Sequence, residues 1–545
     1  MFGYDYVSLS NDEIEARRKL LDQAGWQAYL APLILLSAVF AYRQRLNGQN
    51  ILSGRDQKAS NLDVFSRRVS WLLNTTYIPE FGPLHVQLFG LVYTGYLLFR
   101  ITYQTGNDYM HVTKAFGHVA VSQLPMHYLL SIKSPSSPIT KVTGLTHERL
   151  NAYHRLFGRI IHSLLATHAI LYLRFFAKMD LLPKRIQDWD VRLGIVAFWT
   201  INFLGILAIP PIRAKMYHKV FYRSHVVLSA FLLIVLWFHV PYTRVYVGQS
   251  AIAWILNGVL RKGTSQTATL NCDIVGRDLV RVKATVKGKH LHPYVSGVHV
   301  YIYQSGLGPR TPSTVVSARA LEKVETEVEM IAKNLHGPMT DYLVETAKSG
   351  NKISLELEGP YGEAQMYMPD LLKEVKDRRG KFLLVAGGVG ATYALPIHKA
   401  LLDAGANSED LRMIWIVRNE EDIKWAAPFM VNGKDASPII IHVTQPEAID
   451  PKILKGVKGQ MTRRPDFDKY VDDFFNERLS ASSKNRHELV KDPKKSDQRL
   501  HDTVTIMVCG PRGLSSAVHQ AVGKHVWEYG RDVRWYEEQF GFGGS

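Results

Sequence analysis

Four histidines occupy matched positions inside two apolar stretches of the sequence. They are His154, His168, His225 and His239. The two members of each pair are fourteen residues apart. At 100° per residue, fourteen steps end about 40° short of four full turns, so each pair shares one helix face with about 21 Å between its members. Ionisable groups inside a membrane are costly, which makes such residues candidates for function.

Equal spacing on two helices predicts two cofactors held one above the other. A single histidine in an apolar helix would be interpreted as a core residue bonded to a neighbouring helix, but four in matched pairs favour ligands. Neutral imidazole on both sides of an iron porphyrin fits this arrangement. Such an iron has no open position and carries electrons rather than binding substrate. We predict that His154 pairs with His225 and that His168 pairs with His239.

Three further histidines lie near these pairs. His147 and His218 each precede a predicted ligand by seven residues. Irons at that separation would be only about 10.5 Å apart, so we predict that both residues are interfacial or face haem propionates. His162 lies about 80° away from the ligand face and is predicted to be structural. Gly158 would let a flat ring approach its helix.

The ligands require membrane helices to position them. Most of the six apolar spans reach the ~20 residues that a bilayer needs. They are Trp26–Tyr42, Leu84–Tyr103, Val112–Ile132, Leu150–Phe176, Val191–Ile212 and Val220–Val240. A seventh stretch, Val247–Leu260, is shorter and is predicted to be an interfacial segment or a connector.

This count sets a topology. With six spans and a cytosolic polar half, the N-terminus is inside, and His168 and His239 lie nearer the polar half. The first loop is then outside, although six basic residues in it oppose the positive-inside tendency. They are Arg43, Arg45, Arg55, Lys58, Arg67 and Arg68.

Composition limits the class of protein. The net charge of +17 suggests anionic headgroups, phosphate-bearing cofactors or anionic substrates. Nucleic acid is not an expected partner, because the basic residues are scattered. The two cysteines, Cys272 and Cys509, do not form a disulfide framework and suit a cytosolic polar half. The first residues do not resemble a cleavable signal peptide.

The polar half divides into two patterns. Residues 1–245 form the predicted membrane domain. Residues 262–375 contain short alternating strands with turns between them, which predict an antiparallel β-barrel. Residues 376–545 alternate buried strands with helices, which predicts a parallel α/β domain. A charged insertion is predicted at about 460–502.

Glycine-rich turns follow the predicted strands of the α/β domain. The loop Val385–Thr392 follows a strand and opens a helix, where glycines let backbone N–H groups approach a pyrophosphate. Val508–Pro511 ends another strand at the sheet edge where open α/β sheets bind ligands. Near the end of the chain, Phe540 could cover a flavin ring.

Taken in this order, these motifs resemble the ferredoxin–NADP reductase type of flavoprotein. Behind a two-haem bundle, they resemble the ferric reductase / NADPH oxidase superfamily, and its fungal metalloreductase branch most. The resemblance implies an α-helical membrane bundle of about six transmembrane helices, an FAD-binding barrel and an NADP-binding α/β domain. The spacing of the histidine pairs favours the reductase branch.

The resemblance also assigns cofactor-binding residues. For FAD it implies Arg310, Pro312, Ser313, Thr314, Gly337 and Thr340. Ser313 stands where the family has an aromatic residue, and Thr311 stands in place of a histidine. For NADPH it implies Gly387, Gly388, Gly390, Thr392, Arg418, Gly510 and Pro511. Arg464–Asp466 partly matches a further nucleotide motif, in which Arg463 replaces glycine.

Three residues are assigned to the catalytic centre by the same resemblance, namely Cys509, Glu538 and Phe540. The implied function is transfer of electrons from cytosolic NADPH through FAD and two haem b groups to a ferric or cupric chelate across the membrane. One alternative is an NADPH oxidase that makes superoxide from O2. Another is a non-enzymatic cytochrome-like scaffold. We expect a multi-pass protein of the plasma membrane, or of an internal membrane, with lipid as a partner and an undefined oligomeric state.

Overall fold

A computed structural model describes most of the chain. The described residues are 3–50, 61–216, 220–287, 294–304, 310–322, 325–377, 380–430, 439–445, 460–461, 464–484 and 503–538. They form two compact units, and the main boundary lies between Gly263 and Thr264. Phe540, Arg463, His218 and most of the charged insertion lie outside the described residues.

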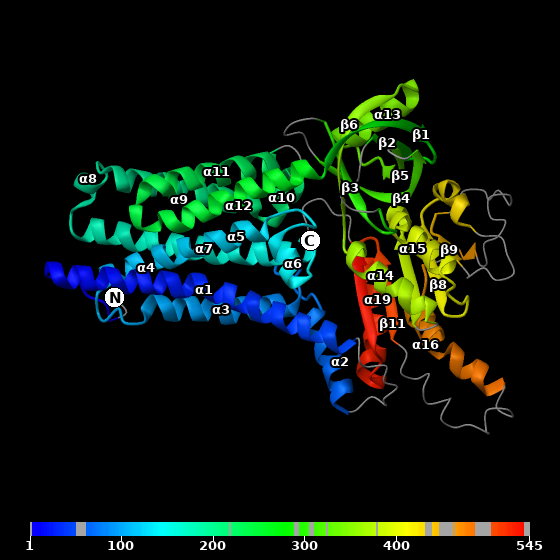
Figure 1. The fold of residues 1–545 in the computed structure, drawn as a ribbon, viewed down its shortest axis with the longest axis horizontal. Helices are drawn as coiled ribbons and strands as arrows, with labels where there is room; N and C mark the ends of the chain where they lie inside the picture. Colours follow the sequence, from blue (N-terminus) through cyan, green and yellow to red (C-terminus); the bar gives the residue numbers. More distant parts are fainter. Residues whose placement is uncertain are drawn as a thin grey trace. The chain divides into compact units, whose positions relative to one another are not determined.

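The first unit is a helical bundle (Figure 1). Its long helices are α1 (Asn11–Asn50), α3 (Leu84–Thr102), α7 (His147–Lys178), α9 (Trp189–Ala208) and α11 (Tyr222–His239). Within the described residues, these five helices are long and apolar enough to cross a membrane. Shorter helices lie between them: α4 (Tyr109–Ser122), α5 (Leu124–Leu130), α6 (Pro138–Thr143), α8 (Leu182–Arg185) and α10 (Pro210–Met216).

The third predicted span is two helices, α4 and α5, which meet at Gln123. Pro125 lies in the first turn of α5, where its missing N–H costs no helical hydrogen bond. Ten residues of α4 are buried, including the polar His111, Thr113 and Ser122. Because protein rather than lipid surrounds α4, its composition is less apolar than that of a lipid-facing span.

The seventh stretch is a full bundle helix, which corrects its prediction as an interfacial connector. Helix α12 (Arg244–Gly263) has 20 residues, about 30 Å, and buries Tyr246, Val247, Ser250 and Ala253. The full length of this helix was not evident from the sequence, because its apolar residues do not extend to its ends. Its first turn begins with Arg244, and its last turn contains Arg261 and Lys262.

Contacts fix the direction of α12. Near its start, the Tyr246 ring lies 5.5 Å from the Trp26 ring of α1. Near its end, Asn257 Oδ1 accepts a hydrogen bond of 3.1 Å from the Lys133 N–H, and Arg261 donates to the Tyr222 hydroxyl at the start of α11. Helix α12 therefore returns to the end of the bundle where α11 begins.

This additional pass reverses the predicted order of the histidine pairs. Since α12 leads directly into the first strand of the second unit, the end of the bundle with His154 and His225 is the end from which the polar half departs. Chain order therefore favours His154 and His225, rather than the expected His168 and His239, as the pair nearer the polar half. If α4–α5 and α12 are counted as passes beside the five apolar helices, the start of α1 would lie on the side opposite the polar half.

Counting α12 as a pass also removes the conflict between the basic first loop and the positive-inside tendency. Helix α2 (Asn61–Asn74), in the loop between α1 and α3, packs within the second unit, so this loop shares a side with the polar half. Its basic residues then agree with the positive-inside tendency. The same count assigns the segment after α7 to the opposite side of the membrane, because it follows the end of α7 that carries His168. Lys178, the last residue of α7, lies there with Lys184 and Arg185.

The second unit begins with a closed six-stranded antiparallel barrel in the order β1-β2-β5-β4-β3-β6. Its elements are β1 (Ser265–Ile274), β2 (Leu279–Lys287), β3 (His299–Tyr303), β4 (Thr311–Glu322), β5 (Glu325–Lys333), α13 (Pro338–Ser349) and β6 (Ile353–Tyr361). Alternate residues of β2 are buried, as expected for a strand with one face toward the barrel core. The barrel confirms the predicted fold, and β4 is a strand that the sequence did not indicate.

The barrel is followed by a parallel sheet in the order β10-β9-β8-β7-β11-β12. Its strands are β7 (Lys381–Gly387), β8 (Leu411–Val417), β9 (Ile439–Val443), β10 (Gln460–Met461), β11 (Val504–Cys509) and β12 (Val533–Glu538). The surrounding helices are α14 (Ala364–Lys376), α15 (Ala391–Asp403), η4 (Glu420–Phe429), α16 (Phe467–Lys484) and α19 (Arg512–Tyr529). The central strand β7 is buried along nearly its whole length, which explains its uninterrupted apolar sequence.

The seven-pass arrangement can be tested by labelling cysteines from one side of the membrane. Gln187 is exposed in the loop after α7, and Lys141 is exposed before it. In cells whose cytosol holds the polar half, we expect a membrane-impermeant maleimide to label Gln187→Cys in intact cells, and Lys141→Cys only after permeabilisation. The six-span arrangement predicts the opposite result. Background labelling should be low because Cys272 and Cys509 are buried.

Candidate functional site

His154 and His225 lie together at one end of the bundle. Their ring centroids are 6.3 Å apart, and the ring planes are inclined by 77°. A metal bonded to both rings would hold the ring centres about 6 Å apart, since each metal–nitrogen bond is about 2 Å. The Nδ1–H of His154 donates to the backbone oxygen of His127 at 3.1 Å, which leaves Nε2 as the unprotonated nitrogen. This spacing and tautomer suit a bis-histidine metal site.

His168 and His239 form a similar pair toward the other end. The Nδ1–H of His168 donates to the Thr113 oxygen on α4 at 2.8 Å, and the Nδ1–H of His239 donates to the Asp190 oxygen on α9 at 2.7 Å. Metal-bound histidines usually donate their second N–H in this way, because the bond fixes the ring and its tautomer.

Glycines on neighbouring helices make room for these rings. A Cβ on Gly117 would lie 2.7 Å from His168, and a Cβ on Gly194 would lie 2.8 Å from His239. The ring that approaches Gly158 is that of His127, which stacks on His154 with ring centroids 4.1 Å apart. Small residues at these points let helices carry imidazoles between them without displacing the backbone.

The remaining histidines differ from the ligand pairs. His162 Nε2 is 3.1 Å from Asn202 Oδ1 on α9, in agreement with a structural role. Within the described residues, no cluster of three or more histidine, cysteine or acidic side chains could hold a metal ion. A haem iron needs two protein ligands, and the facing His154 and His225 rings fit that requirement.

The predicted flavin residues lie at the start of β4. Arg310 forms an ion pair of 2.9 Å with Glu358, and its guanidinium lies 4.3 Å from the centre of the Tyr303 ring. Glu358 is fully buried and also accepts a hydrogen bond of 2.8 Å from the Tyr361 hydroxyl. The structure therefore links Arg310 to the end of β6, where Glu358 and Tyr361 lie.

Other predicted flavin residues occupy strand and helix positions that suit a phosphate ligand. Ser313 and Thr314 are buried in β4, opposite Val300 and His299 of β3. Gly337 is the N-cap of α13, where its N–H donates to Thr340 Oγ1 at 3.1 Å. The N-terminus of this helix has the N–H groups and the partial positive charge that bind a pyrophosphate.

The glycine loop after β7 meets the end of β11. A Cβ on Gly390 would lie 2.8 Å from the carbonyl carbon of Cys509, and a Cβ on Gly387 would lie 2.9 Å from Leu514. Gly388 differs from both, because its φ is +55° and a Cβ there would meet open space. Two of the predicted pyrophosphate glycines therefore permit close packing of strand ends, and the third leaves backbone exposed to a ligand.

Cys509 lies at the carboxyl end of β11 beside two acidic residues. Burial raises the pKa of its thiol far above its ordinary value, and Glu538 and Glu537 raise it further. The thiol stays protonated, so Cys509 does not act as a thiolate nucleophile. Glu538 Oε1 lies 3.5 Å from Nδ1 of His299 on the barrel strand β3. The structure thus brings together the sheet edge and the barrel, which the sequence treated separately.

Two tyrosines complete this cluster and were missed by the sequence analysis. Tyr367 and Tyr393 are hydrogen-bonded through their hydroxyls, and the Tyr367 ring lies 4.1 Å from that of Tyr536. Burial raises the pKa of both hydroxyls well above the usual value, so both stay protonated. Neither residue belongs to a motif, and only the packing of α14 and α15 identifies them.

The other predicted nucleotide residues lie near the carboxyl edge of the sheet. Arg418 follows β8 and is exposed, and Gly510 and Pro511 follow β11. Thr392 donates to the Val389 oxygen at 2.8 Å and holds the loop at the start of α15. Asp466 accepts a hydrogen bond of 3.2 Å from the Lys469 N–H, which gives it a role in starting α16.

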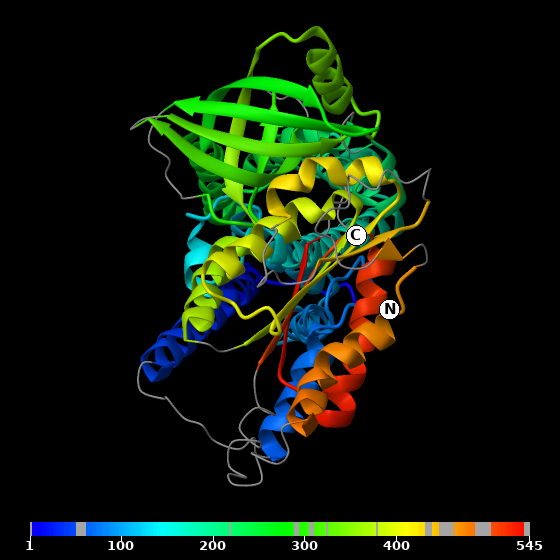
Figure 2. The ribbon, with the colours of Figure 1, turned by 90° about the vertical axis from the view of Figure 1, so that its right-hand side faces the viewer.

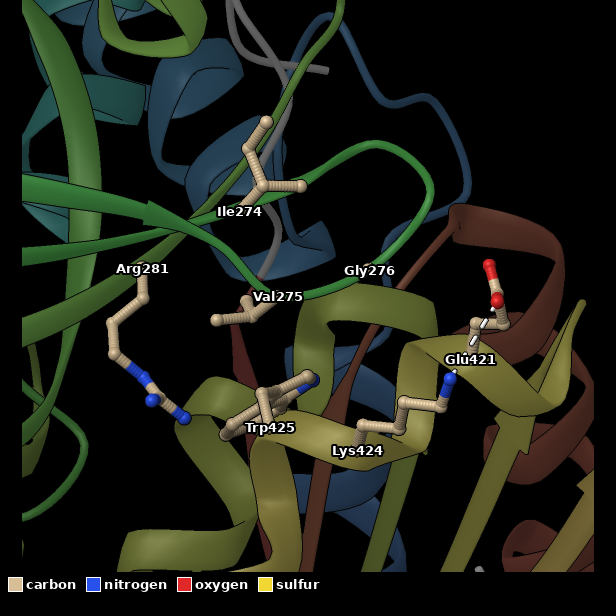
Figure 3. Close-up of a pocket in the computed structure, with 7 residues that line it drawn as sticks. All are labelled: Ile274, Val275, Gly276, Arg281, Glu421, Lys424 and Trp425. Carbon is tan, nitrogen blue, oxygen red and sulfur yellow. Dashed lines mark ion pairs between the residues drawn. The ribbon is translucent and has the colours of Figure 1, made fainter. Parts of the chain in front are cut away.

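A hollow of about 460 Å³ lies between the turn after β1 and η4. Its lining residues are Ile274, Val275, Gly276, Arg281, Glu421, Lys424 and Trp425. Figure 3 shows Arg281 reaching toward Trp425, while Lys424 is paired with Glu421. None of the predicted site residues lines it, so the candidate site is defined by the strand ends and not by this hollow.

Two family models match the chain. Residues 116–236 match the "Ferric reductase like transmembrane component", and residues 381–523 match the "Ferric reductase NAD binding domain". A "Ferric/cupric reductase transmembrane component 2" of Schizosaccharomyces pombe is 23% identical over 490 residues, which are 78% of this chain and 80% of that protein. A "Ferric/cupric reductase transmembrane component 7" of Saccharomyces cerevisiae is 23% identical over 57% of this chain and 50% of its own length.

Among solved structures, a ferredoxin NADP+ reductase from Neisseria gonorrhoeae covers 50% of this chain and 98% of its own. Its sequence identity is 15% and its TM-score is 0.31.

A closed barrel and a parallel nucleotide-binding sheet, joined in sequence to a multi-pass helical bundle with paired histidines, define a membrane oxidoreductase. Its membrane component and its NAD-binding domain both match ferric reductase models. Both parts of the chain therefore resemble ferric reductases, as the sequence predicted.

The close contact at Gly390 predicts a loss of stability when this residue is enlarged. Gly390→Ala would place a Cβ against the Cys509 backbone, and overpacking of this kind costs about 1–3 kcal/mol. Gly513→Ala is the matched control, since a Cβ there meets nothing within 4 Å. Thermal unfolding of the purified protein should show a lower midpoint only for Gly390→Ala. Equal midpoints for the two variants would contradict the packing described here.

Proposed function

We propose that the protein transfers electrons from NADPH, through FAD and two haem groups, across a membrane to a ferric or cupric chelate. The observation that carries this proposal is the matched pairs of half-buried histidines, three of which donate Nδ1–H to a backbone oxygen. Relatives named ferric/cupric reductases support metal chelates as the acceptors. The plasma membrane is the proposed location.

FAD would accept a hydride from NADPH and pass on single electrons, which haem irons can carry. Gly388 and the start of α15 would bind the NADPH pyrophosphate, and exposed Arg418 would lie near its ribose. The α13 N-terminus would bind the FAD pyrophosphate. His299 and Glu538 lie where the barrel meets the sheet edge, which makes them candidates for positioning the two reacting rings.

The order of transfer follows from the passes of the bundle. Electrons would reach the His154/His225 site first, because the second unit departs from that end of the bundle. The His168/His239 site would then deliver them to the acceptor on the far side. Lys178, Lys184 and Arg185 lie on that side and suit an anionic chelate.

The first test is a reduced-minus-oxidised haem spectrum of purified protein with NADPH as the sole reductant. We expect two equivalents of haem per chain, both reduced by NADPH under anaerobic conditions. A protein that binds neither FAD nor haem would instead be a scaffold. Iron reduction that superoxide dismutase abolishes would identify an oxidase.

The order of the two sites can be tested by removing one ligand at a time. In His168→Leu we expect loss of one haem, while the remaining haem is still reduced by NADPH at close to the normal rate. In His154→Leu the remaining haem should be reduced by dithionite but at least tenfold more slowly by NADPH, because its electron donor is lost. Both variants should pass electrons from NADPH to a soluble dye. The reverse pattern between the two variants would overturn the proposed order.

A further inference from the structure

Helix α2 occupies an unusual position in the chain. It lies between the spanning helices α1 and α3, yet it packs within the second unit, beside α19 and the edge strand β12 (Figure 2). Its C-terminal end is fixed close to the membrane helix α3, because the Thr75 oxygen, one residue after α2, accepts a hydrogen bond of 3.0 Å from the Leu84 N–H that begins α3.

One face of α2 packs on the α/β domain through an aromatic contact. Trp71 is 8% exposed and stacks on His519 of α19, with ring centroids 4.2 Å apart and planes inclined by 14°. Its ring also meets Trp535 of β12 edge to face at 5.9 Å. A Cβ on Gly523 would lie 3.1 Å from Trp71 Nε1, so the glycine permits this close approach.

The same face is held by charge at the end of α19. Arg67 donates to the Gly530 oxygen at 3.0 Å and lies 3.9 Å from Asp532. Val64 fills the space beside Gly530, where a Cβ would lie 2.7 Å from Val64 Cγ1. Because Gly530 caps α19 with a φ of +64°, it both ends that helix and receives α2.

The opposite face of α2 carries a second apolar stripe. Leu62, Phe65, Val69 and Leu72 recur at spacings of three and four residues, as on one side of a helix. The side chains of Leu62 and Phe65 are 78% and 65% exposed. At 100° per residue, the centre of this stripe lies about 145° around the helix from the face that contains Val64, Arg67 and Trp71.

We propose that this apolar stripe lies in the headgroup region of the bilayer on the side of the polar half, so that α2 attaches the α/β domain to the membrane surface. Lipid is the partner of choice because α2 lies in the sequence between the spanning helices α1 and α3, and only nine residues separate its end from α3. Arg68 flanks the stripe and suits anionic headgroups. The attachment of α2 to lipid is independent of which acceptor receives the electrons.

The arrangement gives α2 a role in placing the nucleotide site. The strand against which Trp71 packs, β12, ends at Glu538, and α19 begins directly after the Cys509–Pro511 turn. An element that holds both β12 and α19 at the membrane therefore restricts the position of the sheet edge where NADPH is proposed to react.

The test uses full-length protein in proteoliposomes of phosphatidylcholine and phosphatidylserine. A bimane label is placed at Phe65→Cys in the stripe, or at Ser70→Cys, which lies about 120° from its centre. We expect shallow doxyl-labelled lipid to quench the label at position 65 severalfold more than the label at position 70. Aqueous iodide should show the reverse order.

Equal quenching of the two positions by both quenchers would overturn the proposal. A disulfide-linked dimer through the cysteine at position 65, with no quenching by lipid, would assign the stripe to a second copy of the chain and would also overturn it. Hydrogen exchange in detergent tests the other face on its own. Amides of α2 should be protected, and Trp71→Ala should raise exchange in α2 and β12, while Ser66→Ala, at an exposed position of the same helix, leaves both unchanged. Unprotected α2 amides in the unmodified protein would exclude the docking.

Discussion

The hydrogen bonds from imidazole Nδ1–H groups to backbone oxygens are the interaction on which the candidate electron path depends. A neutral imidazole in an apolar bundle has one donor and one acceptor, and a backbone oxygen on a neighbouring helix satisfies the donor. The acceptor, Nε2, is then aimed away from that helix. The bonds of His168 to Thr113 and of His239 to Asp190 thus offset the free-energy cost of removing each Nδ1–H from water. They also select the tautomer that can bind a metal through Nε2. Gly117 and Gly194 are required beside them because a larger residue would displace the ring.

The second unit has a comparable constraint at the ends of its strands. Parallel strands bring their carboxyl ends to one edge, so β7, β11 and β12 place Gly390, Cys509 and Glu538 together. The absence of a side chain at Gly390 lets the loop lie against the Cys509 backbone. The buried thiol and the buried tyrosines 367 and 393 have raised pKa values and remain neutral, so this edge can accept a negatively charged nucleotide without opposing thiolate or phenolate charge. His299 from β3 joins the cluster, which connects the barrel to the sheet.

The side of the membrane assigned to each loop depends on one helix, α12, which composition alone does not identify. Helix α12 begins and ends with basic residues and buries a serine, so its apolar stretch appears too short for a bilayer. Its packing against α1, α5 and α11 makes it a full pass of the bundle. That additional pass changes the side on which every earlier loop lies, and so it reverses the order of the histidine pairs. It also places α2 and the basic first loop on the side of the polar half.

The sequence alone determined the four histidines, their pairing, the barrel followed by the α/β domain and the glycine loop. These features depend on local spacing, which a helix or a strand converts directly into geometry. Only the tertiary structure decided which pair lies nearer the second unit, that Arg310 pairs with Glu358, and that Tyr367, Tyr393 and His299 meet Glu538. The physical reason is that such contacts join residues far apart in the chain, and nothing in their local sequence distinguishes them from ordinary core residues. The two faces of α2 show the same limit, because its partner Trp535 lies more than 460 residues further along the chain.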